Sequence, residues 1–100
     1  MLVDITDEPE AKEAGFKIPV CLTRSVYEHV LVPEKLEGCQ DYKGRLWDTV
    51  YMATLAFRQK KDKLVLFKVI YQMETGPQEV EMWLVFNAHE GFTIMLPSDY

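Results

Sequence analysis

Asp48 is the residue in this sequence best placed to act as a general acid or base. It lies in GRLWDTVYMATLAFRQ, residues 44–59, a segment whose apolar residues recur as they do in a helix that is apolar on most sides. A catalytic carboxylate buried in such a helix would need a second polar group to exchange protons with. The side chains that could supply this group are Tyr27, Tyr51 and His29.

A structural role for Asp48 has a simpler physical basis. A carboxylate near the first turn of a helix is stabilised by free backbone N–H groups and by the positive end of the helix dipole. Arg45 lies one helical turn before Asp48 and can also neutralise its charge. We therefore predict that Arg45 and Asp48 are structural polar residues, and we assign no catalytic residue.

The remaining residues that could do chemistry do not form a recognisable motif. The candidate metal ligands Cys21, His29, Cys39 and His89 lack the short ligand pairs that hold a zinc ion. Cys21 follows Val20 in an alternating segment, so we expect it in the core rather than in a nucleophilic pair with a histidine. The five glycines occur singly, which is not typical of a phosphate-binding loop. We predict neither a metal nor an organic cofactor, and no small-molecule substrate can be named.

The charge of the chain is unevenly distributed. Its formal net charge is -5, which argues against direct binding to nucleic acid because phosphate neutralisation requires a clustered basic surface. Residues 4–13 contain five acids against one lysine, whereas the region from Arg58 to Lys68 is basic. The acidic residues Glu8, Glu10 and Glu13 support an alternative function, in which an acidic surface blocks a host nucleic-acid-binding defence protein.

Length and composition indicate one globular domain spanning residues 1–100. The chain has 100 residues, of which 48% are hydrophobic, enough for one core. Two cysteines and the absence of a signal peptide predict a reducing, cytoplasmic location. The longest apolar runs are far shorter than the roughly 20 residues that cross a bilayer, so we expect no membrane segment.

The hydrophobic periodicity predicts an α+β fold. The N-terminal half has a short strand at 2–6, a helix that begins after Asp7 and ends at Gly15, and an extended segment at 16–22. A helix capped by Thr23 then covers 24–32, a loop covers 34–43, and the helix at 44–59 lies at the centre of the fold.

From Leu64 the hydrophobic period changes from that of a helix to that of a strand. Three strands follow, around the turns ETGPQ and NAHEG, with core residues such as Val65, Phe67, Leu84 and Ile94 on one face. We therefore predict a three-stranded antiparallel β-meander, with the short N-terminal strand and three helices packed on one face of it. Pattern alone leaves open whether the N-terminal strand joins this sheet.

The reverse face of the predicted sheet is more apolar than a solvated face usually is. Its apolar residues, here called the outer-face residues, are Leu66, Ile70, Trp83, Val85 and Met95. Either the N-terminal segment or the loop at 34–43 covers them, or they bind a protein partner. In the second case the partner is another protein or a second copy of the chain, a homodimer with Trp83 as anchor, and an exposed edge strand could also pair between subunits.

Four blocks of the sequence resemble a family of small uncharacterised proteins carried by bacteria, plasmids and phages. The blocks are LVDIT, EAGFKIPVCLTRSVYEHV, GRLWDTVYM and TIMLPSD, in this order along nearly the whole chain. The resemblance implies an accessory protein of a mobile element, within a domain family of unknown function that has no assigned activity or cofactor. Members of that family have more residues before LVD, which either a trimmed chain or a shorter member explains.

These observations lead to one preferred function and two alternatives. We expect a non-enzymatic, cytoplasmic accessory protein that binds another protein or itself. The first alternative is the acidic antagonist of a host defence protein. The second is a small enzyme centred on Asp48.

Overall fold

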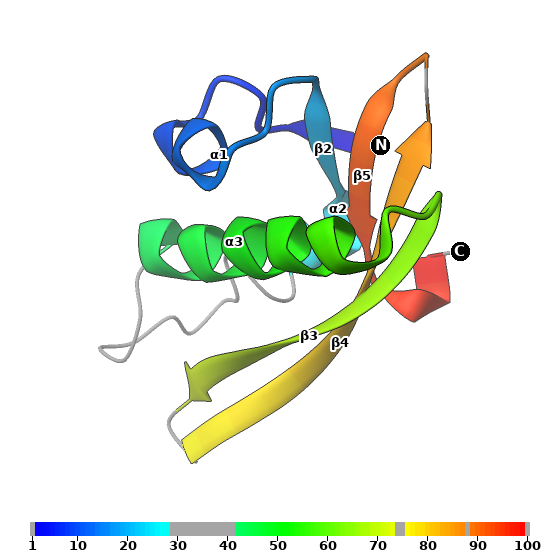
Figure 1. Ribbon diagram of the computed structural model, residues 1–100. Coiled ribbons are helices and arrows are strands. Elements are labelled where there is room, and N and C mark those ends of the chain that lie inside the picture. Colours follow the sequence, from blue (N-terminus) through cyan, green and yellow to red (C-terminus); the bar gives the residue numbers. More distant parts are fainter. Residues whose placement is uncertain (1, 29–41, 74–75, 88, 100) are drawn as a thin grey trace.

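Five strands form one mixed sheet in the computed structural model, which describes residues 2–28, 42–73, 76–87 and 89–99 (Figure 1). Their order across the sheet is β1, β2, β5, β4, β3. The strands are β1 (Leu2–Asp4), β2 (Val20–Thr23), β3 (Leu64–Met73), β4 (Gly76–Asn87) and β5 (Gly91–Met95). The strand pair formed by β2 and β5 is parallel, and the other three pairs are antiparallel.

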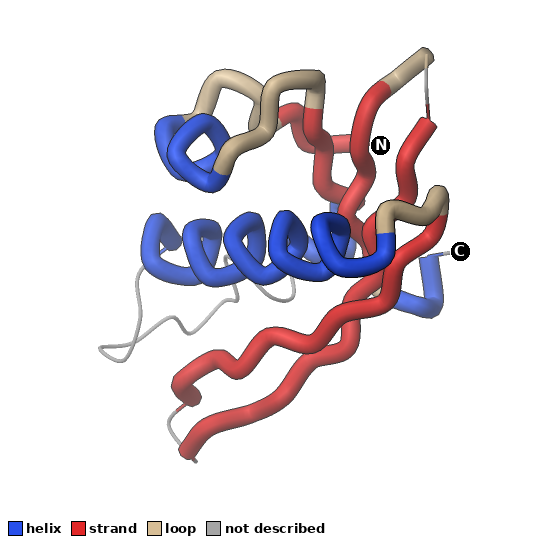
Figure 2. Tube along the Cα trace, in the orientation of Figure 1, coloured by secondary structure: helices blue, strands red, loops and turns tan. Residues whose placement is uncertain are grey.

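The long helix lies between the short acidic helix and the sheet. Helices α1 (Pro9–Ala14) and α3 (Tyr42–Lys60) contact each other, and α3 also contacts β3. Figure 2 shows both helices on the same side of the strands. The short helix α2 (Arg24–Val26) continues directly from β2, and a turn of 3-10 helix, η2 (Pro97–Asp99), contacts β4 on the side of the sheet away from α1 and α3 (Figure 1).

The core lies between α3 and the inner face of the sheet. Alternate residues of β3 are buried, because successive side chains of a strand point to opposite faces. The same alternation continues into β4 and β5, where Leu84 and Ile94 are buried. From the helix side Leu46, Val50 and Ala53 complete this core. The predicted core faces of β3, β4 and β5 are therefore confirmed.

Two of the three predicted helix boundaries have the expected cause. Gly15 ends α1 with a φ of 105°, a left-handed conformation that glycine adopts without steric cost. The Thr23 side chain accepts a hydrogen bond from Val26 N and so caps α2. Asp7 does not cap α1, because the helix begins at Pro9 and its N-cap is Glu8, which makes no capping bond through its side chain.

The predicted α+β class is confirmed, but the predicted sheet was too small. Strands β3, β4 and β5 do follow one another as antiparallel neighbours, and β2 and β1 then extend the sheet beyond β5. The N-terminal strand therefore joins the sheet. The predicted packing of the N-terminal strand and three helices on one face does not match in detail. The strand β1 lies within the sheet, and η2, which was not predicted, contacts β4 from the other side (Figure 1).

Parts of the two remaining predictions fall outside the described residues. Of the helix expected at 24–32, the structure describes residues 24–28, and of the loop expected at 34–43 it describes residues 42 and 43, which belong to α3. The long helix packs from two directions as predicted, although Tyr51 and Met52 on its remaining side are exposed.

Candidate functional site

The residues predicted to be structural lie around a buried tyrosine between α3 and β3. Arg45 is only 3% exposed, and its guanidinium lies 5.5 Å from the centre of the Tyr71 ring, within the range of a cation–π contact. The Thr49 hydroxyl shares a hydrogen bond with the Tyr71 hydroxyl at 2.5 Å and donates another to the carbonyl oxygen of Arg45. This arrangement fastens the first half of α3 to the sheet.

Asp48 does not lie in the first turn of its helix. The helix begins at Tyr42, so Asp48 falls in the second turn, where the helix dipole contributes less than predicted. The side chain is half-buried and lines a depression of about 290 Å³ together with Tyr51, Lys68 and Glu79. Asp48 therefore faces the open side of the α3–β3 interface.

Burial of the Tyr71 phenol makes the stability of the chain sensitive to pH in the alkaline range. Burial raises the pKa of this phenol above its ordinary value of 10.0, and the charge of Asp48 adds to the rise, while Thr49 and Arg45 oppose it. Because the folded chain retains the proton more tightly than the unfolded chain, the stabilisation is complete below pH 10 and is lost as the pH rises further.

We therefore expect the free energy of unfolding to fall above about pH 10 by up to about 1.4 kcal/mol per pH unit more in the wild type than in Tyr71→Phe. Urea unfolding at a series of alkaline pH values measures both slopes. The phenylalanine variant loses the titrating group but keeps the ring, and parallel slopes would contradict the assignment.

Cys21 lies on the outer face of the sheet and not in the core as predicted. Its neighbours Val20 and Leu22 are the buried residues of β2, while Cys21 is opposite Asp4 on one side and Thr93 on the other. Burial raises the pKa of its thiol, and the nearby charges of Asp4 and Glu90 raise it further. These effects disfavour the thiolate that a nucleophile or a metal ligand requires.

The structure describes two of the four candidate metal ligands, Cys21 and His89. His29 and Cys39 lie outside the described residues, and His89 is exposed in the connection between β4 and β5. In the described parts of the chain, no three His, Cys, Asp or Glu side chains gather closely enough to hold a metal ion.

The acidic residues near the N-terminus do not share one environment. Glu13 is exposed, whereas Glu8 at the N-cap of α1 and Glu10 in its first turn are half-buried. Asp4 accepts hydrogen bonds from the backbone N–H and the hydroxyl of Thr6, and these bonds lower the pKa of its carboxyl. One of the five acids of this segment, Asp4, is thus engaged in contacts within the chain.

The outer-face residues fall into two groups. Leu66 and Ile70 are 52% and 59% exposed. Trp83, Val85 and Met95 lie on the same face but are half-buried. The N-terminal segment does not cover this face, because β1 joins the sheet at the edge farthest from β3. The predicted surface is therefore most open along β3.

Strand β3 presents an open backbone edge. Phe86 N donates to the carbonyl oxygen of Lys63 at 2.8 Å, and the register then continues without interruption along β3 and β4. Odd-numbered residues of β3 therefore direct their N–H and C=O groups toward β4, and Leu66, Lys68 and Ile70 direct theirs away from it. Among the described strands, none pairs with that edge.

Two depressions follow this edge, one after the other. The one beside Asp48 continues into a second of about 430 Å³, and Met52 and Lys68 line both. The second is bounded by Leu55 of α3 and Leu66 of β3. Sequence reasoning identified the strand residues, but the expectation of a helix that is apolar on most sides and central did not reveal that Tyr51 and Met52 are exposed.

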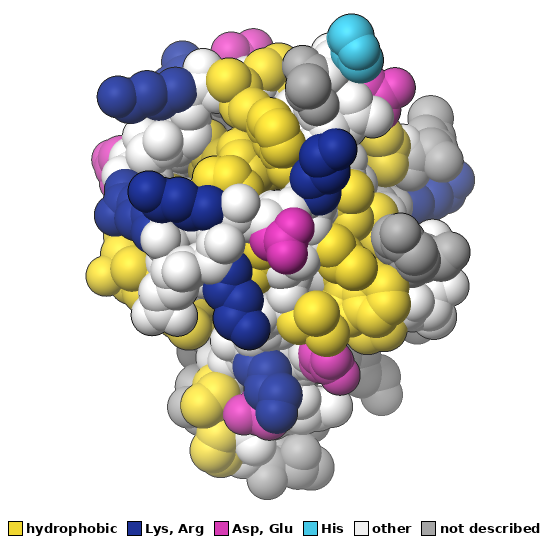
Figure 3. All heavy atoms as spheres, turned by 45° about the vertical axis from the view of Figure 1, so that its right-hand side comes forward, with side chains coloured by type: hydrophobic (Ala, Val, Ile, Leu, Met, Phe, Trp, Pro, Cys, Tyr) yellow, Lys and Arg dark blue, Asp and Glu magenta, His cyan; other side chains and the backbone are white. Residues whose placement is uncertain are grey.

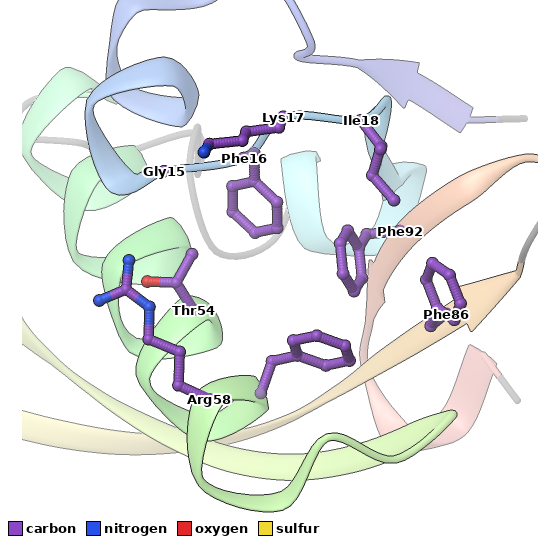
Figure 4. Close-up of a pocket in the computed structure, with 9 residues that line it drawn as sticks. Gly15, Phe16, Lys17, Ile18, Thr54, Arg58, Phe86 and Phe92 are labelled. Atoms are coloured by element: carbon purple, nitrogen blue, oxygen red, sulfur yellow. The ribbon is translucent and has the colours of Figure 1, made fainter.

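A third depression is an aromatic pocket that sequence reasoning missed. It has a volume of about 320 Å³ and lies where the loop after α1, the end of α3 and the ends of β4 and β5 meet (Figure 4). We call this site the aromatic pocket; its lining residues are Gly15, Phe16, Lys17, Ile18, Thr54, Phe57, Arg58, Phe86 and Phe92.

The rings of the aromatic pocket pack around Phe92. Its ring centre lies 4.9 Å from that of Phe57, 5.1 Å from that of Phe86 and 5.3 Å from that of Phe16. The first and third of these contacts are edge-to-face, a favoured geometry for aromatic pairs. Each phenylalanine looks like an ordinary core residue in the sequence, so the only local signal was the aromatic content.

Comparisons with known proteins do not assign this chain to a family, since it matches no family model, no curated protein and no solved structure. The resemblance to the family of mobile-element proteins stays a prediction. No helix in the described part of the chain has the length and apolar character needed to cross a bilayer.

Proposed function

We propose that this chain acts by binding a second copy of itself through the open edge of β3. The observation that carries the proposal is the row of exposed backbone groups on a strand of 10 residues, flanked by exposed Leu66 and Ile70. An edge of this kind is a template for pairing with another strand. Such pairing would extend two five-stranded sheets into one.

The distribution of charge along the edge favours a second copy as the partner. Lys60, Lys61 and Lys63 lie between the end of α3 and the first residue of β3, whereas Asp48 and Glu79 lie beside the later part of β3. Antiparallel pairing about a twofold axis brings the basic end of each copy to the acidic end of the other. Figure 3 shows Lys and Arg side chains interspersed with Asp and Glu side chains on one face of the molecule.

Lys68 in the middle of the edge is compatible with this pairing. A central lysine often prevents unwanted strand association, because its charge would be buried in the new interface. Here the Lys68 ammonium lies 3.6 Å from the Glu79 carboxylate on the neighbouring strand. This ion pair reduces the net charge that the second copy would meet.

The test is the oligomeric state measured by size-exclusion chromatography with light scattering. We expect a species of twice the chain mass of 11.7 kDa, and we expect Ile70→Asp to raise the dissociation constant by at least about tenfold. The matched control is Leu2→Asp, since Leu2 is 51% exposed on the opposite edge of the sheet. A wild-type monomer at high protein concentration, or equal effects of both variants, would refute the proposal.

A charge exchange distinguishes specific pairing from general loss of stability. Glu79→Lys should weaken the dimer by placing like charges at both ends of the interface, and adding Lys63→Glu in the same chain should restore it. Dimerisation of the wild type should also weaken as salt is raised, because exposed ion pairs are screened. A double variant weaker than Glu79→Lys would count against the antiparallel arrangement.

A further inference from the structure

The aromatic pocket combines an apolar floor with a positively charged rim. Figure 4 shows Phe16, Ile18 and Phe92 directed into the space, with the ends of Lys17 and Arg58 on the side nearer Gly15. Figure 3 shows hydrophobic side chains gathered on the surface with Lys and Arg side chains beside them. The pocket therefore has one apolar side and one cationic side.

The cations of the rim are available to a ligand. Lys17 and Arg58 are exposed, and across the described parts of the chain neither makes an ion pair. A carbon atom added at Gly15 would lie 3.1 Å from the Arg58 terminal nitrogen, so the guanidinium extends across the end of α1. Thr54 adds a hydroxyl that donates to the Tyr51 carbonyl and can still accept a hydrogen bond.

Backbone hydrogen bonds fix one wall of the pocket relative to the sheet. Phe92 N donates to the carbonyl oxygen of Pro19 at 2.8 Å, which ties the loop carrying Phe16 and Ile18 to the beginning of β5. Ile5 N donates to the carbonyl oxygen of Val20, the first residue of β2, at 3.1 Å and so holds the strand into which this loop leads. The wall formed by the loop after α1 is therefore fixed relative to the sheet.

We infer that the aromatic pocket binds a small aromatic carboxylate, with its ring among the phenylalanines and its carboxylate at Arg58 and Lys17. A cavity of about 150 Å³ holds benzene, and the volume of about 320 Å³ leaves room for a ring with a short acidic chain. Guanidinium groups bind carboxylates through paired N–H donors, which explains a preference for this anion. The site is separate from the edge of β3 and is independent of the proposed self-association.

Cinnamate and its neutral analogue cinnamamide test this inference by calorimetric titration. They have the same ring and nearly the same shape but differ in charge. We expect cinnamate to bind with a dissociation constant of about 0.1 to 1 mM and cinnamamide at least about fivefold more weakly. Raising the salt concentration should weaken the binding of cinnamate more than that of cinnamamide.

Three variants locate the site and assign its charge. Arg58→Met should reduce the preference for the carboxylate, because Lys17 remains as the one cation of the rim. Ile18→Ser should weaken the binding of both compounds by loss of apolar contact. Lys43→Met is the matched control, because Lys43 is exposed and does not line the pocket. Failure of both compounds to bind, equal binding of the two by the wild type, or an unchanged preference in Arg58→Met would each overturn the inference.

Discussion

Replacement of Gly91 by alanine is expected to lower the free energy of unfolding by at least about 3 kcal/mol. Gly91 has a φ of 95°, and an added Cβ would lie 2.1 Å from the carbonyl oxygen of Pro19. That oxygen accepts the hydrogen bond from Phe92 N that joins the loop after α1 to β5. To relieve the steric overlap between the added Cβ and Pro19, the backbone at both residues would have to move. The hydrogen bond between Phe92 N and the Pro19 carbonyl oxygen and the parallel pairing of β2 with β5 would therefore weaken together.

Gly76→Ala provides the matched control. Gly76 also has a positive φ, of 112°, but an added Cβ meets no atom within 4 Å. Gly76→Ala should therefore lower the free energy of unfolding only by the strain of a left-handed backbone conformation, about 1 to 2 kcal/mol. Thermal unfolding followed by circular dichroism should show a loss of more than about 12 °C for Gly91→Ala and roughly half of that for Gly76→Ala. Equal losses would mean that the contact with Pro19 does not constrain the fold.

The contact between Gly91 and Pro19 also shows what the sequence could not predict. Hydrophobic alternation correctly located β3, β4 and β5, because each is long enough to repeat its pattern and consecutive strands commonly pair. Strand β2 has 4 residues and pairs with β5 about seventy positions later in the chain. No local pattern specifies this parallel pairing, which depends on how the whole chain closes.

The burial of polar residues could not be predicted from the sequence either. Arg45 lies on the long helix as predicted, but its burial over the Tyr71 ring depends on the packing of α3 against β3. The aromatic pocket has the same origin, because Phe16, Phe57 and Phe92 come from three separate segments and each fits a core pattern. Periodicity indicates that a residue lies on the core side of its helix or strand. Whether that residue is buried in the core or lines a pocket depends on the tertiary arrangement.

Ile94→Ala is expected to cost about 2 to 5 kcal/mol, the range for truncating a large buried aliphatic side chain. Ile94 is fully buried, opposite Leu22 of β2 and Leu84 of β4, both of which are also buried. Truncation would open a cavity between Leu22 and Leu84, where β5 joins β2 to β4. Urea unfolding of dilute protein measures the change in the free energy of unfolding.

Met95→Ala, the neighbouring substitution on the opposite face, is expected to cost about 1 kcal/mol or less. Met95 is half-buried beside Trp83, so its removal leaves a surface that solvent can fill. The difference between the losses in free energy of unfolding for Ile94→Ala and Met95→Ala measures how much more tightly the inner face of the sheet is packed than the outer face. If Met95→Ala were as costly as Ile94→Ala, the outer face would be a second core within the monomer. A small cost in dilute protein that grows at concentrations where the dimer forms would instead link this face to self-association. A contact made only in the dimer stabilises the folded chain more and more as the protein concentration rises above the dissociation constant.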